Sequence, residues 1–278
     1  MDQPLMGQEM SHRASGFAAA FLPLRRWRKG GLRAALLGTV LLTATACANG
    51  DNGANDPLEP MNRAVYKVNQ AVDYVLLRPL AYAYRDGLPD PIQERIGNTL
   101  RNLASPVVLA NDLMQGEWDR AWSTFMRFLI NSTWGLAGLH DIAAPMGFKR
   151  HDEDFGQTLA VAGVDEGPYI VLPLLGPSNA RDAVGRAVDW AMDPVRILAA
   201  AKNWDEFQWT RTGLTVVDAR ASLIDPINEI ERSSLDTYVA LRSMYRQRRA
   251  AEISNQPGGY GSGVDGSDFD FQDPPKTQ

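Results

Sequence analysis

Apolar residues recur at helical spacing along this chain, and this pattern constrains its fold more than any other feature of the sequence. In residues 62–77 they fall at three- and four-residue steps along one face: Ala64, Val65, Val68, Ala71, Val72, Val75 and Leu76. Such spacing predicts an amphipathic helix. The same pattern recurs in residues 91–103, 116–131, 183–191 and 235–249.

Signals for other structure are scarce. The helix over 91–103 is expected to stop at Ser105-Pro106, because the residue before a proline disfavours helical backbone. Residues 169–175 are apolar, but Pro173 interrupts them and limits the segment to an extended or edge conformation. We therefore predict an all-α fold.

Residues 121–139 form a nearly uncharged run in which Arg127 is the exception. The run is compatible with a helix in the membrane plane or a re-entrant helical hairpin bent at its glycines, with Trp122, Phe125 and Phe128 facing lipid. The pattern alone favours the alternative, an ordinary buried helix capped by Gly135. We expect Trp122 and Trp134 to favour the membrane–water interface.

The first 46 residues have the layout of a secretory signal. Basic residues precede the apolar segment 34–46, which ends in small residues and is too short to span a bilayer. The single cysteine of the chain, Cys47, follows directly. This arrangement resembles a bacterial lipoprotein signal, in which the cysteine is acylated, although Ala44 stands where that pattern usually has leucine. The alternative is an exported protein in which Cys47 is incidental.

Replacing Cys47 by alanine tests the anchor. Two or three acyl chains hold a protein at a membrane firmly, whereas one holds it marginally. We expect Cys47→Ala to leave an unprocessed or soluble product in cell fractionation. Normal membrane fractionation of this variant would contradict the anchor.

The sequence divides into four parts by composition. Residues 1–46 are expected to be a cleaved signal peptide, and 47–55 a lipidated tether rich in small polar residues. Residues 56–254 form the predicted helical domain. Residues 255–278, rich in Gly, Asp and Pro, are expected to be a disordered acidic tail.

Charge and motifs exclude several functions. The whole chain has a net charge of −5. Basic residues outnumber acidic ones in residues 1–46, so the remainder of the chain is more acidic than the whole. This argues against nucleic acid as a partner and against docking on anionic lipid through a basic patch. Only His140 and His151 follow the signal, and no nucleophile–base pair is evident, so we predict no catalytic site and no cofactor. The run His151–Asp154 is interpreted as a solvated loop rather than a metal site.

Several motifs in order resemble the VacJ family, the MlaA outer-membrane lipoproteins. They are DPLEPMNRAVYKVNQ, RPLAYAYRDGLP, LINSTWGLAGLHDIA and FGQTLAVAGVDEGPYIVLPLLGPSNARD. The resemblance runs from Asp56 to about Arg249. It implies a ring of amphipathic helices in the periplasmic leaflet of the outer membrane, around a central channel. Through that channel, phospholipids misplaced in the outer leaflet pass to a soluble periplasmic carrier, MlaC, which maintains lipid asymmetry. It also implies association with trimeric porins.

The resemblance assigns candidate residues by motif. Those implied at the channel hairpin are Trp134, Gly135, Leu136, Ala137, Gly138 and Leu139. Those implied at the first helix and the channel entrance are Asp56, Pro57, Asn62, Arg63, Asn69 and Asp73. For Asp56-Pro57 a plain helix start is the alternative, because aspartate caps helices and proline opens them.

Two rival functions stay open at this point. One is an envelope scaffold lipoprotein that organises porins without moving lipid. The other is an envelope hydrolase, against which the scarcity of histidine and the absence of a nucleophile motif argue.

Overall fold

The computed structural model describes residues 55–255, and these are predominantly helical, which confirms the all-α prediction. The signal peptide 1–46, Cys47, the tether up to residue 54 and the tail from residue 256 lie outside the described residues. The elements in chain order are α2 (Glu59–Val72), the π-helical turn η2 (Asp73–Leu77), α3 (Arg78–Gly87), α4 (Asp90–Gln115), α5 (Trp118–Thr133), α6 (Phe155–Val161), β1 (Tyr169–Leu172), β2 (Gly176–Asn179), α7 (Ala180–Met192), α8 (Pro194–Ala201), α9 (Asp205–Ser222), α10 (Ile224–Ser233) and α11 (Thr237–Ile253).

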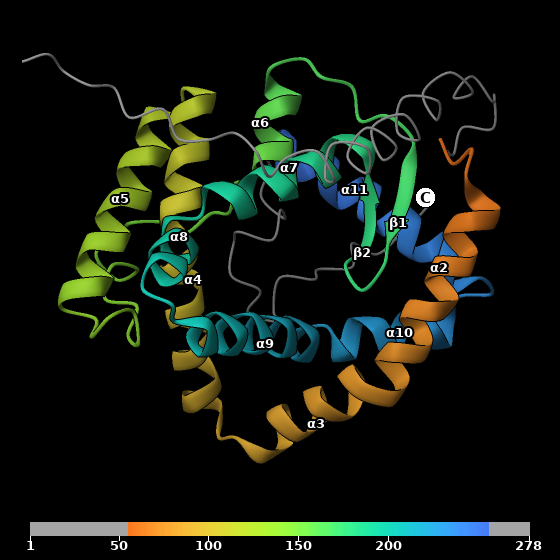
Figure 1. Cartoon of the computed structure of the whole chain (residues 1–278), viewed down its shortest axis with the longest axis horizontal. Coiled ribbons are helices and arrows are strands. Elements are labelled where there is room, and N and C mark those ends of the chain that lie inside the picture. The colour runs from red at the N-terminus through yellow and green to blue at the C-terminus, as the bar shows by residue number, and fades with distance from the viewer. Residues whose placement is uncertain (1–54, 256–278) are drawn as a thin grey trace, which may run out of the picture. The chain divides into compact units, whose positions relative to one another are not determined.

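The contacts between these elements form a closed circuit. Helix α2 runs through η2 into α3, and α3 contacts both α4 and α9. Helix α4 packs along α5 and reaches α6, which packs on α7. Helix α7 contacts both strands, and β1 returns to α2. Figure 1 shows this succession, with α9 and α10 along one side.

The strands β1 and β2 form an antiparallel hairpin, in which Tyr169 is opposite Asn179 and Leu172 is opposite Gly176. Pro173 lies in the turn between them, where its missing N–H removes no hydrogen bond from the ladder. Of the segment 169–175 predicted to be extended, residues 169–172 form strand β1 and residues 173–175 form the turn.

The predicted end of a helix at Ser105-Pro106 is wrong. Helix α4 continues through Pro106 to Gln115, where Gly116 ends it in left-handed backbone with φ 79°. A proline inside a helix removes the hydrogen bond to the carbonyl four residues earlier, here that of Asn102. The second half of α4 packs along α5, and this tertiary packing offsets the local penalty.

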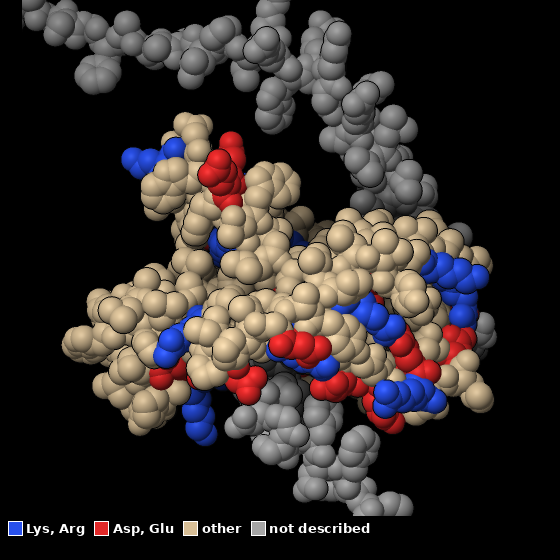
Figure 2. Space-filling model, turned by 90° about the horizontal axis from the view of Figure 1, so that it is seen from below, with Lys and Arg blue, Asp and Glu red and all other residues tan. Residues whose placement is uncertain are grey.

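The burial of side chains is inverted relative to an ordinary globular helix. On α2 the buried residue is Asn62, whereas two residues of the predicted apolar face, Val68 on α2 and Val75 on η2, are 59% and 75% exposed. Among residues 55–255, buried polar side chains outnumber buried apolar ones. Apolar burial is confined mainly to two small clusters, Ala81, Tyr84, Ala221 and Ile224, and Tyr169, Val171 and Tyr238. Figure 2 shows broad uncharged areas on one face of the molecule.

Within residues 55–255, every helix is too short or too polar to cross a bilayer.

Candidate functional site

Helix α5 presents a continuous apolar face outward. Trp118, Trp122, Phe125 and Leu129 are all exposed, and the rings of Trp122 and Phe125 lie 5.9 Å apart. Of the three predicted lipid-facing residues, Trp122 and Phe125 are exposed, while Phe128 is half-buried. The face thus combines the residue types that favour a membrane interface with the exposure such contact needs.

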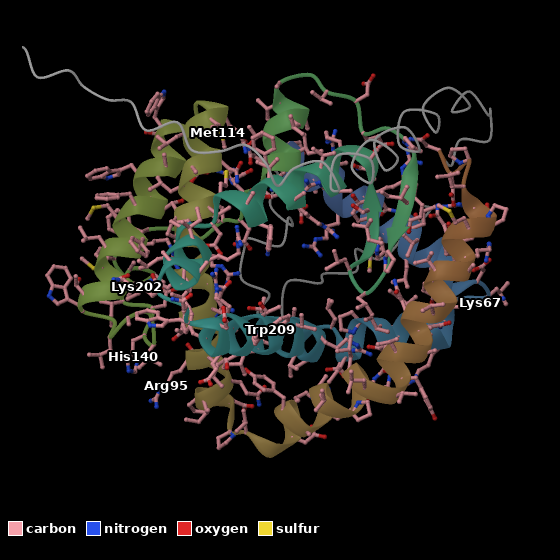
Figure 3. All side chains as sticks on the ribbon, in the orientation of Figure 1. Lys67, Arg95, Met114, His140, Lys202 and Trp209 are labelled. Carbon is pink, nitrogen blue, oxygen red and sulfur yellow. The ribbon has the colours of Figure 1, made fainter. Side chains whose placement is uncertain are left out.

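The tryptophans of residues 55–255 are all exposed, and none is part of the core. The least exposed, Trp204, retains 54% of its surface, and Trp209 on α9 retains 77%. In Figure 3 Trp209 is labelled on α9. Packing among residues 55–255 does not bury any of these six indoles, which lie on helix surfaces and loops: Trp118, Trp122, Trp134, Trp190, Trp204 and Trp209.

The predicted hairpin residues form a compact loop after α5. The backbone N–H of Gly138 donates to the carbonyl of Asn131 at 2.8 Å, and that of His140 donates to Gly135 at 3.0 Å. Trp134 and Leu136 are 72% and 61% exposed, and Ala137 and Leu139 are also exposed. Figure 3 places His140 at this end of α5. The loop therefore holds several apolar side chains outward from a tight backbone.

The two glycines of this loop serve close packing rather than helix bending. Helix α5 ends at Thr133, so the run contains one helix and a turn instead of a helical hairpin. A Cβ on Gly135 would lie 2.3 Å from the carbonyl oxygen of His140. A Cβ on Gly138, whose φ is +90°, would lie 2.5 Å from the Cβ of Asn102 on α4. Both glycines are buried; Gly135 packs against the end of α5 and Gly138 against α4.

The single charge in the run, Arg127, holds the following segment. Its guanidinium donates to the carbonyl of Phe148 at 2.7 Å and to Oδ2 of Asp141 at 2.6 Å. Burial acts to raise the pKa of Asp141, but Arg127 and Asn131 donate to its carboxylate and hold the pKa below its ordinary value. Arg127 thus acts as an internal clamp.

The first-helix residues are tied to distant elements. Asp56 accepts from Asn62 at 2.8 Å and from Arg242 of α11 at 2.6 Å. Asn62 donates to the carbonyl of Tyr169 at 3.0 Å and accepts from the N–H of Val171 at 2.9 Å, so one amide fixes α2 to β1. Asp56 does not cap the helix: α2 begins at Glu59 with Leu58 as its N-cap, so the interpretation of Asp56-Pro57 as a plain helix start is wrong. Pro57 is exposed.

The other three predicted residues, Arg63, Asn69 and Asp73, also contact distant elements. Arg63 pairs with Asp236 at 2.8 Å and stacks over Tyr238 at 4.4 Å. Asn69 donates to the carbonyl of Leu172 at 2.9 Å and accepts from the N–H of Leu174 at 2.8 Å. Asp73 forms a bidentate pair with Arg220 of α9 at 2.6 and 2.9 Å. These polar residues fix where the first helix lies.

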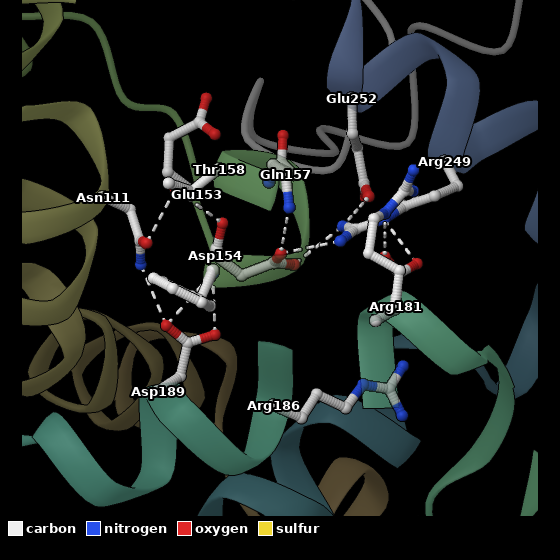
Figure 4. Close-up of polar contacts among 12 residues, drawn as sticks. Asn111, Glu153, Asp154, Gln157, Thr158, Arg181, Arg186, Asp189, Arg249 and Glu252 are labelled. Atoms are coloured by element: carbon white, nitrogen blue, oxygen red, sulfur yellow. Dashed lines mark hydrogen bonds and ion pairs between the residues drawn. The ribbon is translucent and has the colours of Figure 1, made fainter. Parts of the chain in front are cut away.

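Sequence reasoning missed a buried polar network in which Arg249 of α11 is central. Arg249 pairs with Asp154 and with Asp182 at 2.7 Å each, and with Glu252 at 3.0 Å. Asp154 also caps α6 by accepting from the N–H of Gln157. Figure 4 shows the network between α6, α7 and α11, together with the neighbouring contacts of Asp189. Burial acts to raise the pKa of Asp154, but Arg249 holds it below its ordinary value.

The interpretation of His151–Asp154 as a solvated loop is wrong. Glu153 is buried, Asp154 joins the network, and His151 contacts the fully buried Asp112. Nε2 of His151 lies 2.9 Å from Oδ1 of Asp112 and 3.2 Å from Oγ1 of Thr124. Because one nitrogen faces both groups, this is not the relay in which a histidine uses its two nitrogens between carboxylate and hydroxyl. In the part of the chain that the structure describes, no cluster of three His, Cys, Asp or Glu is arranged to hold a metal ion.

Known proteins match this chain over most of its length. The sequence model of the MlaA lipoprotein family matches residues 54–252. The intermembrane phospholipid transport system lipoprotein MlaA of Escherichia coli strain K12 is 34% identical over 229 residues, which cover 78% of this chain and 86% of that protein. An uncharacterized protein of Rickettsia felis is 32% identical over 206 residues, or 74% of this chain and 80% of that protein. A solved structure from work on the structural basis for maintenance of bacterial outer membrane lipid asymmetry matches with a TM-score of 0.62 at 32% identity, covering 71% of this chain and 98% of that chain.

Proposed function

This chain belongs to the MlaA lipoprotein family, and from that premise we propose that it is an outer-membrane lipoprotein that removes misplaced phospholipids from the outer leaflet. The phospholipids pass through an amphipathic channel within the helical circuit to a soluble MlaC-like carrier in the periplasm. The protein thereby maintains the lipid asymmetry of the outer membrane.

The inverted burial of the helices is the observation that carries this proposal. Apolar faces on α2, α5, α8 and α9 point outward, while polar and charged side chains lie between the elements. A water-soluble globule would reverse this arrangement, because exposed apolar area costs about 25 cal/mol per Å². Insertion of these faces into one leaflet, with acyl chains on Cys47 as a further anchor, removes that cost.

The polar interior suits lipid transfer for a solvent reason. A phospholipid headgroup is costly to move through hydrocarbon because its charges lose their hydration. A path with polar groups on one side and apolar surface on the other lowers that barrier and still accommodates the tails. The chain supplies no energy source of its own in this scheme, so the carrier and a trimeric porin are proposed as the partners that set direction and position.

Site-specific photocrosslinking tests the path. A photoreactive residue at Leu136 or Trp134 is expected to capture phospholipid in intact cells, because both side chains project outward from the loop after α5. Arg95, an exposed residue of α4 that Figure 3 labels, provides the control position. Equal lipid capture from all three positions, or none from Leu136 and Trp134, would refute the path.

Charges on the outward face of α5 are expected to weaken membrane insertion. In a Cys47→Ala background, where acyl chains do not dominate, the double change Trp122→Asp and Phe125→Asp should reduce cosedimentation with phospholipid vesicles at least about tenfold. Placing a charged side chain at the bilayer centre costs about 2.5–3.5 kcal/mol, and placing it near the bilayer surface costs less. Thermal unfolding in detergent should change little, because both side chains are exposed in the fold.

The control for this change retains the apolar character. Trp122→Phe with Phe125→Leu should bind vesicles nearly as the parent does. If the aspartate variant and the apolar control bind equally, α5 is not the inserted face.

A scaffold that organises porins without moving lipid is the alternative. Its exposed apolar faces would then contact protein instead of lipid. Two measurements on the purified lipoprotein separate the functions. If the protein binds labelled phospholipid and transfers it to the soluble carrier, the proposal is supported. If it binds porin but no phospholipid, the scaffold is supported.

A further inference from the structure

A solvent-open pocket lies between α4, α5 and the segment that joins α5 to α6. Its empty space, including the open mouth, is about 470 Å³. The charged and titratable side chains that line it are Arg101, Arg127, Arg150, His151, Asp141 and Asp152. Three arginines therefore face two aspartates, and the lining carries surplus positive charge within an acidic protein.

The surplus positive charge of the pocket lies on Arg101. Arg127 is committed to Asp141 at 2.6 Å, and Arg150 pairs with Asp152 at 3.3 Å. Within residues 55–255, Arg101 has an amide partner, Oδ1 of Asn98 at 2.6 Å, and no carboxylate partner. A guanidinium has five N–H donors, so most of those on Arg101 remain available.

Its surroundings increase the electrostatic cost of leaving Arg101 unpaired. Burial and the positive charge of Arg150 lower the pKa of Arg101, although nearby aspartates partly oppose them. One of these, Asp218, already accepts the hydroxyl of Tyr84 at 2.9 Å. An anion in the pocket would relieve the repulsion between the arginines.

Two further polar atoms of the lining are buried without a hydrogen-bond partner in the described chain. They are Nε of Arg150, a donor, and Oδ1 of Asn102, an acceptor. Asn102 is only 6% exposed, and its amide nitrogen donates to Ser132 at 2.9 Å. Buried donors are normally satisfied, so Nε of Arg150 indicates a missing acceptor in the pocket, whereas Oδ1 of Asn102 is itself an acceptor and does not bear on an anion.

We propose that this pocket binds a phosphate group, with Arg101 and Arg150 as its donors. Planar guanidinium groups match phosphate oxygens in pairs, and such charge-assisted hydrogen bonds are stronger than neutral ones. The phosphate belongs to a phospholipid headgroup or to a small soluble phosphate. The headgroup assignment rests on the proposed function, whereas phosphate binding itself does not.

Titration of the purified acylated protein in detergent tests the pocket. Inorganic phosphate, glycerol 3-phosphate and the diester glycerophosphoethanolamine are added separately at constant ionic strength, with calorimetric detection. Saturable binding is expected, and Arg101→Gln should weaken it about 10- to 100-fold, as expected for hydrogen bonds to a charged group. Arg101→Lys should keep part of the affinity because it keeps the charge.

Arg95→Gln is the matched control, since Arg95 lies on the same helix but is exposed and does not line the pocket. The thermal midpoints of both glutamine variants show whether the fold is retained. Equal affinities of Arg101→Gln and Arg95→Gln, or no saturable binding by the parent protein, overturn the proposal.

The probes separate the two sources of phosphate. Binding of the diester supports a lipid headgroup, whereas binding of inorganic phosphate alone supports the pocket and overturns the headgroup assignment. Lipid crosslinking from Leu136 is measured in parallel. If lipid crosslinking occurs but no phosphate probe binds, the pocket proposal fails and the proposed function stands. If lipid crosslinking is absent from the protein with an unchanged pocket, the proposed function fails whatever the titrations show.

Discussion

Replacing Arg249 by methionine is expected to lower the free energy of unfolding by about 3–5 kcal/mol. The arginine is 7% exposed and pairs with Asp154 of the α6 N-terminus and Asp182 of α7. Methionine retains much of the volume but removes the charge, so both carboxylates lose the partner that compensates their burial. Denaturant unfolding of the protein in detergent measures the loss.

The neighbouring Arg248 provides the control. Its pair with Glu252 at 2.7 Å is partly exposed, and a surface pair contributes about 0–1 kcal/mol. Arg248→Met should therefore leave unfolding nearly unchanged. Similar losses in both variants would show that the charge of α11, rather than the buried network, determines stability.

The pH dependence gives a second measurement on the same variant. The pKa of Asp154 lies below its ordinary value of 3.8, so in the parent protein its contribution to stability is present above that value and is lost as the pH falls through the depressed pKa. Without Arg249, burial is left to raise this pKa. As the pH falls toward this raised pKa, the variant should therefore gain stability relative to the parent, in which only the other buried carboxyls, such as Glu153 and Asp189, have raised pKa values. A constant difference between the two as the pH falls would contradict the assignment.

Adding a methyl group at Gly135 is expected to destabilise the loop after α5. The new Cβ would lie 2.3 Å from the carbonyl oxygen of His140 and 2.5 Å from that of Asn131, and neither backbone atom can move without shifting the loop. Overpacking of this kind typically costs about 1–3 kcal/mol. Gly135→Ala should therefore lower the unfolding midpoint and expose the loop to limited proteolysis.

The opposite change two residues away is expected to have the opposite sign. Ala137 has a φ of 59°, in the left-handed region that costs a residue with a Cβ about 1–2 kcal/mol. Ala137→Gly relieves that strain, partly offset by the greater freedom of glycine in the unfolded chain, and should leave the fold unchanged or slightly more stable. Destabilisation of similar size in both variants would mean that any change in the loop is disruptive, and the steric account of Gly135 would fail.

The close packing of Gly135 and Gly138 determines which positions of the loop can be altered without unfolding it. A large residue at Gly135 or Gly138 would disturb packing against α4 and α5 before it could obstruct any lipid path. Leu136 and Trp134 are the informative positions, because their side chains are exposed and can be altered without contact with the core.

The sequence by itself determined the helical class, the apolar face of α5 and the family. Helical spacing depends on residues three and four apart, so it can be read locally, and family resemblance depends on motifs in order. The spacing shows which residues share a face, but not whether that face points to a core or away from it. For α2 and α5 the tertiary structure shows that it points away.

Only the tertiary structure decided which polar residues meet. Arg249 and Asp154 are 95 positions apart, and no local pattern distinguishes their charges from solvated ones. The continuation of α4 through Pro106 and the tie between Asn62 and β1 likewise depend on packing partners that sequence spacing does not specify. In this protein the helix faces follow from local periodicity, whereas its polar interior is set by contacts between distant segments, because a charge is buried only where folding provides its partner.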